Sequence, residues 1–199
     1  MTCGMNLELG LEALRRVYRS SRAEQGVEVI DEVHLDVAVL PVLSDAAMRE
    51  IVREVLRGDG WTQRDDGSLE KSFGDAVATL SPDASGVTLR VRTATTVSAT
   101  GSAAVEKDTG ERAAQREAER RAAEALKAVA DKERERLSAE NMKALTREEP
   151  TLRAEVQRAL NRTYRRALEE RARQMGEVES INERGDEGGS YEVTVVVKA

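Results

Sequence analysis

The sequence has little of several residue types that proteins use for chemistry or for cross-linking. Cys3 is its single cysteine and His34 its single histidine. One cysteine excludes an intrachain disulfide framework and a zinc site built from several cysteines. A general base or a metal ligand at His34 needs a second polar partner, and no motif supplies one. Phosphate-binding loops and nucleophile elbows are also missing. We therefore expect no catalytic residues, no metal and no cofactor, in a protein that is not an enzyme.

Aromatic side chains are scarce as well. They make up 3% of the 199 residues, with one Trp and one Phe. A core must therefore consist mainly of Val, Leu and Ala, without the large contact area that aromatic rings provide. No apolar run approaches the ~18 residues of a membrane-spanning helix. The first twenty residues lack a cationic start followed by an apolar segment. The expected location is cytoplasmic, without membrane insertion.

Charge is abundant and unevenly distributed. Lys and Arg number 31 against 37 Asp and Glu, a net charge of −6. Residues 105–180 hold 18 of the basic and 17 of the acidic residues, which leaves 13 basic and 20 acidic residues elsewhere, a net charge of −7. The remainder of the chain is therefore acidic, and nucleic acid is not an expected partner of the protein as a whole.

Residues 1–30 form the first segment of the predicted organisation. Leu11, Leu14, Val17 and Tyr18 recur at helical spacing. This spacing favours a short amphipathic helix that ends near Gly26. An N-terminal arm is the alternative.

Residues 31–104 are expected to form an α+β sheet domain. In "EVHLDVAVLPVL" the apolar residues alternate, as in a strand with one buried side. Ser44 is a favourable N-cap for a helix that ends near Gly58. "WTQRDDGSLEKSF" and "ATLSPDASGVTLRV" each place turn residues between short strands, which is typical of β-hairpins. The sheet is therefore predicted to be antiparallel.

Residues 105–180 have the composition of long helices, and Pro150 marks a predicted break between two of them. Two long helices joined by a short connection pack as an antiparallel hairpin, which returns the chain to its starting point. The alternating segment "YEVTVVVK" within 181–199 is then expected to rejoin the sheet. The predicted fold is thus α+β: a small antiparallel sheet with one packing helix, and a helical hairpin inserted before a C-terminal strand that completes the sheet domain. Deleting Tyr191 to Ala199 is expected to destabilise that domain.

The candidate interaction surface lies on the second half of the helical region and at one tryptophan. From Leu152 to Gly176 there are seven Arg and three Glu. Arginines that recur three, four and seven residues apart project from one side of a helix and can bind phosphates. The favoured interpretation is a solvated face paired with Glu169 and Glu170, because no aromatic platform accompanies the arginines. Trp61 begins a strand and is most simply a core residue, with a binding hot spot as the second choice. The candidate residues are Trp61, Arg158, Arg162, Tyr164, Arg165 and Arg166.

Two stretches carry a family resemblance. "VLSDAAMREIVREVLRGDGWTQRDDGSLEKSF" combines an early helix with a Gly-Trp strand start, and "NRTYRRALEERARQMGEVESINERGDEGGSYEVTVVVKA" combines a closing helix, an acidic turn and a terminal strand. The layout resembles accessory components of bacterial FtsH ternary systems and a related uncharacterised family of cyanobacterial and plastid reading frames. This resemblance implies a small adaptor that works beside a MoxR-type ATPase, a von Willebrand A domain protein and an FtsH-like component. It brings no catalytic residues with it.

We therefore expect a non-enzymatic interaction module of a multiprotein ATPase-associated system. The alternative is an RNA-binding or ribosome-associated protein that uses the arginine-rich helix face. An alanine-lined helical hairpin can pack on itself or on a second copy, so the sequence leaves both a monomer and a homo-oligomer as alternatives.

Overall fold

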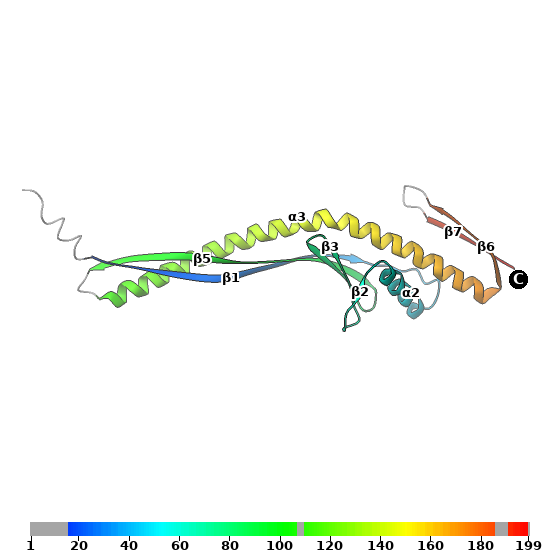
Figure 1. Ribbon diagram of the computed structural model, residues 1–199, viewed down its shortest axis with the longest axis horizontal. Coiled ribbons are helices and arrows are strands. Elements are labelled where there is room, and N and C mark those ends of the chain that lie inside the picture. Colours follow the sequence, from blue (N-terminus) through cyan, green and yellow to red (C-terminus); the bar gives the residue numbers. More distant parts are fainter. Residues whose placement is uncertain (1–15, 107–109, 186–190, 199) are drawn as a thin grey trace, which may run out of the picture. The chain divides into compact units, whose positions relative to one another are not determined.

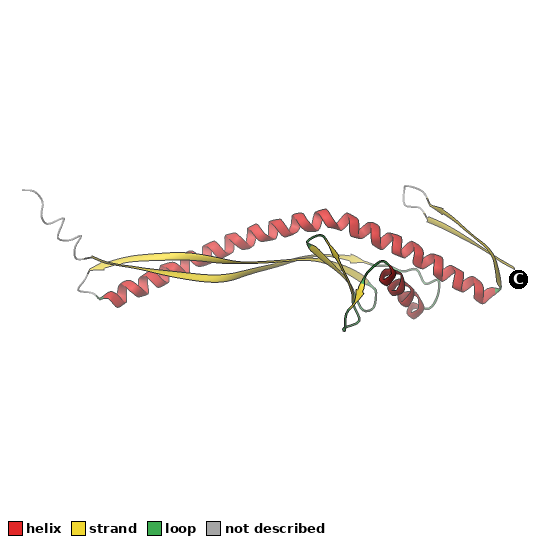
Figure 2. Ribbon diagram, in the orientation of Figure 1, coloured by secondary structure: helices red, strands yellow, loops and turns green. Residues whose placement is uncertain are grey.

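The computed structural model describes residues 16–106, 110–185 and 191–198 (Figures 1 and 2). The chain divides into two compact units. The ribbon unit comprises the described residues within 1–29 and 92–140, and the core unit comprises those within 30–91 and 141–199. The long elements β1 (Arg16–Asp36), β5 (Gly86–Glu106) and α3 (Glu111–Met175) contribute residues to both units.

Helix α2 (Asp45–Gly58) lies where the sequence predicts a helix. The hydroxyl of Ser44 caps it by accepting a hydrogen bond from the Ala47 N–H at 3.4 Å. Gly60 follows the helix with a φ of +86°, a conformation that favours glycine and that turns the chain into the next strand. The apolar face of α2 is buried at Met48, Ile51, Val52, Val55 and Leu56.

Five strands form one antiparallel sheet in the order β1-β5-β4-β3-β2. β2 (Thr62–Gln63) pairs with β3 (Leu69–Phe73), and β4 (Ala76–Leu80) pairs with β5, so both predicted hairpins are confirmed. β3 and β4 also form a hairpin, whose two-residue loop begins at Gly74 with a φ of +55°. The prediction of an α+β fold with an antiparallel sheet is therefore correct.

The N-terminal prediction of a short helix is wrong where the structure describes it, because Arg16–Asp36 is one continuous strand. Residues 1–15, including Leu11 and Leu14, lie outside the described residues. Within β1 the better-buried side chains are those of alternate residues, from Arg19 through Val27 to Leu35, with the exception of the exposed Gln25. This period of two suits a strand, and β5 supplies the hydrogen-bond partners that override a weak helical pattern.

The predicted helical hairpin is also wrong, since α3 is a single helix of 65 residues with Pro150 inside it. Proline removes one backbone hydrogen bond but does not by itself prevent the helix from continuing. Leu145 and Leu152, on either side of Pro150, are fully buried in the core. Their packing stabilises the helix on both sides of Pro150 and outweighs the free-energy cost of the lost backbone hydrogen bond.

The C-terminal strand does not rejoin the main sheet, contrary to the prediction. β7 (Tyr191–Lys198) pairs antiparallel with β6 (Glu177–Gly185) in a separate two-stranded sheet. A single helix does not return the chain to its starting point, which removes the geometric basis of the expectation. β6 follows directly after α3, so a hairpin is the nearest way to pair β7.

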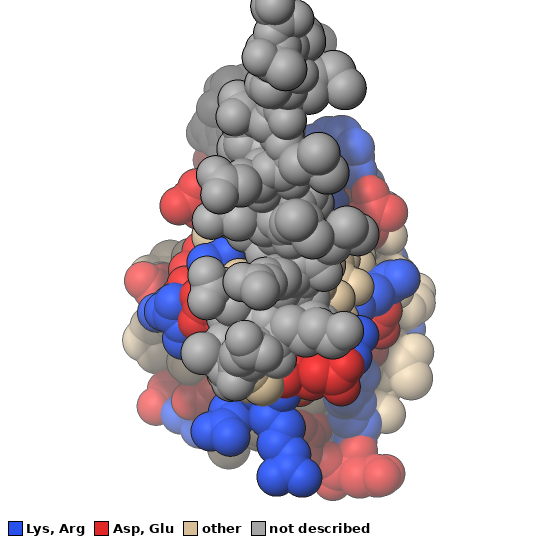
Figure 3. Space-filling view, turned by 90° about the vertical axis from the view of Figure 1, so that its left-hand side faces the viewer, with Lys and Arg blue, Asp and Glu red and all other residues tan. Residues whose placement is uncertain are grey.

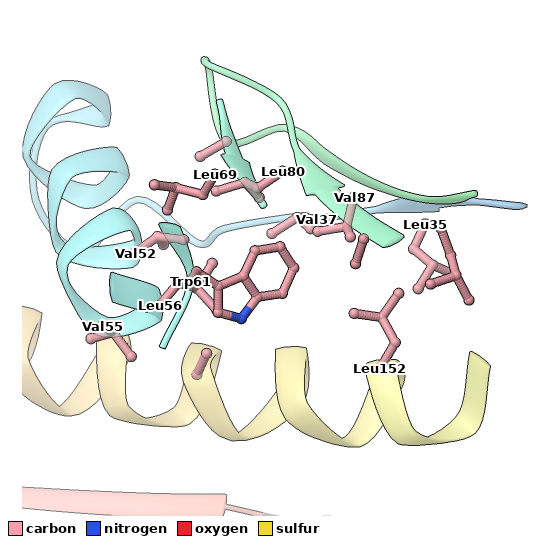
Figure 4. Close-up of a cluster of buried hydrophobic side chains, with 14 of the residues drawn as sticks. Leu35, Val37, Val52, Val55, Leu56, Trp61, Leu69, Leu80, Val87 and Leu152 are labelled. Atoms are coloured by element: carbon pink, nitrogen blue, oxygen red, sulfur yellow. The ribbon is translucent and has the colours of Figure 1, made fainter. Parts of the chain in front are cut away.

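The main hydrophobic core lies within the core unit. α2, the sheet and the second part of α3 enclose it, and Figure 4 shows Trp61 between these three elements. The fully buried side chains include Leu69, Leu80, Leu89 and Leu152, each with 0% exposure. As the composition predicts, aliphatic residues make up most of this core.

The ribbon unit is held together by small residues. Gly101 of β5 lies so close to α3 that a Cβ at this position would collide with the carbonyl oxygen of Ala118 and the backbone nitrogen of Ala122. Ala114, Ala118 and Ala122 are themselves fully buried. Alanine and glycine allow close backbone approach but bury little apolar area. A small second cluster adds Val27, Ala130 and Leu137.

The surface carries charges of both signs. Where Figure 3 shows described residues, basic and acidic side chains are intermixed. Along α3 many of them form ion pairs three or four residues apart, such as Arg121 with Glu117 at 2.8 Å. Hydrogen bonds from Arg120 and Arg121 lower the pKa of Glu117 to about 2. The near-equal numbers of basic and acidic residues in 105–180 thus correspond to ion pairs along α3.

Candidate docking groove between α2 and α3

A partly buried polar network anchors α3 beside Trp61. The indole Nε1 of Trp61 donates a hydrogen bond to Glu155 Oε1 at 2.7 Å, and the Lys71 ammonium donates to both Glu155 oxygens at 2.8 and 2.9 Å. Lys71 also donates to the carbonyl oxygen of Asp59 at 2.9 Å. Phe73 packs edge-on against Trp61, with ring centroids 6.2 Å apart. These contacts join α3 to the end of α2 and to β3.

Arg162 ties α3 to the residue that follows α2. Its guanidinium makes two hydrogen bonds to the carboxylate of Asp59, one of them from Nη1 at 2.7 Å and the other from Nη2. This paired geometry is the strong form of an arginine–carboxylate contact. The hydrogen bonds to Asp59, aided by its charge, raise the pKa of Arg162 above its ordinary value, so the cation is retained.

Arg165 and Arg166 also have acidic neighbours. Arg166 Nη1 lies 3.4 Å from Glu54 Oε2 on α2, and Arg165 Nε donates to Glu169 Oε1 at 2.9 Å within α3. Both arginine side chains are about half exposed. They are thus positioned by carboxylates while part of each guanidinium still faces solvent.

The three arginines line an open groove with a volume of about 380 Å³. α3 contributes Arg162, Arg165, Arg166 and Glu169, and α2 contributes Glu54, Val55 and Gly58. We call this feature the arginine groove. Its walls carry three guanidinium groups and the two carboxylates of Glu54 and Glu169, and the guanidinium groups can bind an anionic ligand group.

The structure brings together three of the six residues singled out from the sequence. Arg158 lies outside the groove, and its Nε donates to its own helix at the Ala154 carbonyl, 3.2 Å away. Tyr164 is half-buried, and its hydroxyl accepts a hydrogen bond from the Leu40 N–H at 3.1 Å. Trp61 is 3% exposed and is a core residue, so it does not belong to an exposed surface.

Sequence reasoning missed the acidic partner of Arg166 on α2 and that of Arg162 directly after α2. Glu54 and Asp59 are about a hundred residues away from their arginine partners, so no local spacing could reveal them. The sequence does predict the pair of Arg165 with Glu169, because a separation of four residues places both on one helix face.

Within residues 16–106, 110–185 and 191–198, no group of three or more His, Cys, Asp or Glu side chains could hold a metal ion. None of the helices described there combines the length and the apolar character that crossing a membrane requires.

Residues 14–198 match the family described as FtsH ternary system domain X5. The chain belongs to this family. The predicted resemblance to FtsH ternary system components is thereby confirmed. No curated protein and no solved structure matches the chain. Membership of the X5 family makes the protein part of an FtsH ternary system, and hence of a system with several protein components.

Proposed function

We propose that this X5 domain is a non-enzymatic adaptor that binds an acidic segment of a protein partner in the arginine groove. The partners proposed are the components that the family resemblance implies: a MoxR-type ATPase, a von Willebrand A domain protein and an FtsH-like component. The observation that supports the proposal most directly is the convergence of Arg162, Arg165 and Arg166 on one groove between two helices.

The groove has the properties of a binding site that is formed before the partner arrives. α2 and α3 are both packed on the hydrophobic core, and the network around Glu155 holds α3 close to the end of α2. Groups that are already ordered lose little entropy on binding. Arginine is enriched at protein interfaces and recognises carboxylates through paired hydrogen bonds.

The partner is expected to displace intramolecular carboxylates. Glu54 and Glu169 occupy part of the guanidinium surface of Arg166 and Arg165. The Arg166–Glu54 pair is about half exposed on both sides, so it contributes little to stability and can be exchanged at small cost. Glu169 is 19% exposed, so the exchange of its pair with Arg165 costs more. An incoming acidic segment would make the same bonds.

The test is capture of partners with a charge-reversed groove. Arg165→Glu/Arg166→Glu is compared with wild-type protein in pull-downs from a lysate of the native host and in binding titrations with the purified system components. Arg158→Glu is the matched control, because it makes one charge reversal on the same helix outside the groove. The double variant is expected to bind at least about tenfold more weakly, which corresponds to about 1.4 kcal/mol, while the control binds like wild type.

Two results would contradict the proposal. One is capture of the ATPase, von Willebrand A or FtsH-like component that the double variant leaves unchanged. The other is recovery of RNA, with an affinity that falls steeply as salt rises and that Arg158→Glu weakens as well. Thermal unfolding of each variant shows whether a loss of binding arises from a loss of folding.

A further inference from the structure

The hairpin of β6 and β7 has open strand edges. Its two strands pair only with each other within the described residues, from Glu177↔Lys198 to Gly185↔Tyr191. None of its described side chains is buried, although Ile181, Val193 and Val195 form an apolar row. A two-stranded hairpin is marginally stable in water, and a third strand or a packing partner normally stabilises it.

The two edges differ in their suitability for a further strand. β6 is irregular, because its register shifts between Val178 and Ser180. Such a bulge interrupts the regular row of backbone donors and acceptors that an added strand needs. The register of β7 is continuous over all eight residues, from Tyr191 to Lys198. β7 therefore presents the better edge.

The charges of β7 are arranged symmetrically. Glu192 lies three residues before Val195, and Lys198 lies three residues after it. If two copies of β7 pair antiparallel around Val195, Glu192 of each copy lies opposite Lys198 of the other. Arg184 is already the register partner of Glu192 within the hairpin, so the charges would alternate across three strands as Arg184, Glu192 and Lys198 of the second copy.

We propose that β7 pairs antiparallel with β7 of a second copy of this chain, and that the two hairpins form a continuous four-stranded sheet. The contact is isologous: the same residues meet from both sides around a two-fold axis. An antiparallel register shifted by one residue in either direction would place one valine of the apolar row opposite Lys198 or Thr194, and a parallel pairing in register would place Glu192 opposite Glu192. Antiparallel registers that differ by two residues all keep the apolar side chains on one face. Among these, the register centred on Val195 pairs Glu192 with Lys198.

The experiment measures self-association by analytical ultracentrifugation of Glu192→Lys, Lys198→Glu and an equimolar mixture of the two. Each variant alone brings like charges together across the axis and is expected to raise the dimer dissociation constant at least about tenfold. In the mixture, one chain carries lysine at both positions 192 and 198 and the other carries glutamate at both, so opposite charges meet across the axis. A heterodimer of near wild-type affinity is expected.

The mixture separates contact between copies from damage within a hairpin. Any strain that a substitution causes inside its own hairpin is the same alone and in the mixture, so recovered association can come only from across the axis. Glu179→Lys on β6 is the matched control and is expected to associate like wild type. A mixture as weak as its components overturns the proposal. So does a wild-type protein that stays monomeric up to about 1 mM, which would leave the edge of β7 to a strand of another protein.

Discussion

Trp61 and Glu155 show how a single contact can decide the role of a residue. Trp61 is the one tryptophan of the chain, and its indole N–H is satisfied by a carboxylate 94 residues further on. The sequence predicts burial of Trp61 correctly, because it follows a helix end and begins a strand. It cannot show that Glu155 accepts the hydrogen bond, since nothing near Glu155 distinguishes it from other helical glutamates.

Glu155→Ala is expected to lower the free energy of unfolding by about 2–3 kcal/mol, because it leaves the buried Trp61 N–H without an acceptor and Lys71 without its carboxylate. Glu155→Gln should cost roughly half as much, since an amide oxygen still accepts from Trp61 but carries no charge for Lys71. Urea denaturation followed by tryptophan fluorescence measures both.

Glu170→Ala is the matched control for this pair. Glu170 is an exposed glutamate on the same helix, and its removal is expected to change the free energy of unfolding by less than about 0.5 kcal/mol. Equal effects at Glu155 and Glu170 would show that the network around Trp61 contributes no stability of its own.

At the scale of elements, local sequence patterns predict the secondary structure well, whereas features that depend on residues far apart in the chain are not predicted. α2 and the hairpins of β2–β3 and β4–β5 follow from caps, turns and periodicity within about twenty residues. The strand character of β1 depends on β5, which lies far along the chain. The continuity of α3 through Pro150 depends on the burial of Leu145 and Leu152, which no local propensity encodes.

The same limit applies to the arginine groove. Arg162, Arg165 and Arg166 share one side of α3, and helical spacing predicts this. Glu54, Val55 and Gly58 reach the groove because α2 packs beside α3, and this arrangement arises only in the folded core. The sequence could therefore predict one wall of the groove but not the opposite wall.

Close packing of β5 on α3 leads to a prediction for the ribbon unit. Gly101→Ala introduces a Cβ where the backbone of Ala118 and Ala122 already lies, so β5 or α3 must shift. The expected loss of unfolding free energy is about 1–3 kcal/mol, as for other overpacked interiors. Hydrogen exchange of the amides in 111–130 should report the loosening directly.

Gly26→Ala serves as the control for Gly101→Ala. Gly26 lies on β1 in the same unit, and nothing lies within 4 Å of a Cβ built there. Alanine at this position is expected to be neutral or to stabilise by up to about 1 kcal/mol, because it restricts the unfolded chain. If both variants destabilise equally, general strand propensity rather than the contact with α3 accounts for the effect.

At the scale of the whole molecule, the separate sheet of β6 and β7 reverses an expectation from the sequence. The core cluster extends from Leu35 to Ala167 and includes no described residue of β6 or β7. Removing Glu177 to Ala199 is therefore expected to leave the midpoint of thermal unfolding within about 2 °C of the full-length value. If β7 instead completed the core, a loss of about 3 kcal/mol would lower the midpoint by about 6–12 °C.

The same truncation separates stability from assembly. If β7 joins two copies, the truncated protein is monomeric at concentrations where the full-length protein is a dimer, and both unfold at nearly the same temperature at low concentration. Lys198→Glu should reproduce the monomeric state without shortening the chain, because the hairpin remains while the contact across the two-fold axis is repelled. A truncated protein that unfolds at a lower temperature but still forms dimers would show that β7 stabilises the core and that the dimer contact lies elsewhere.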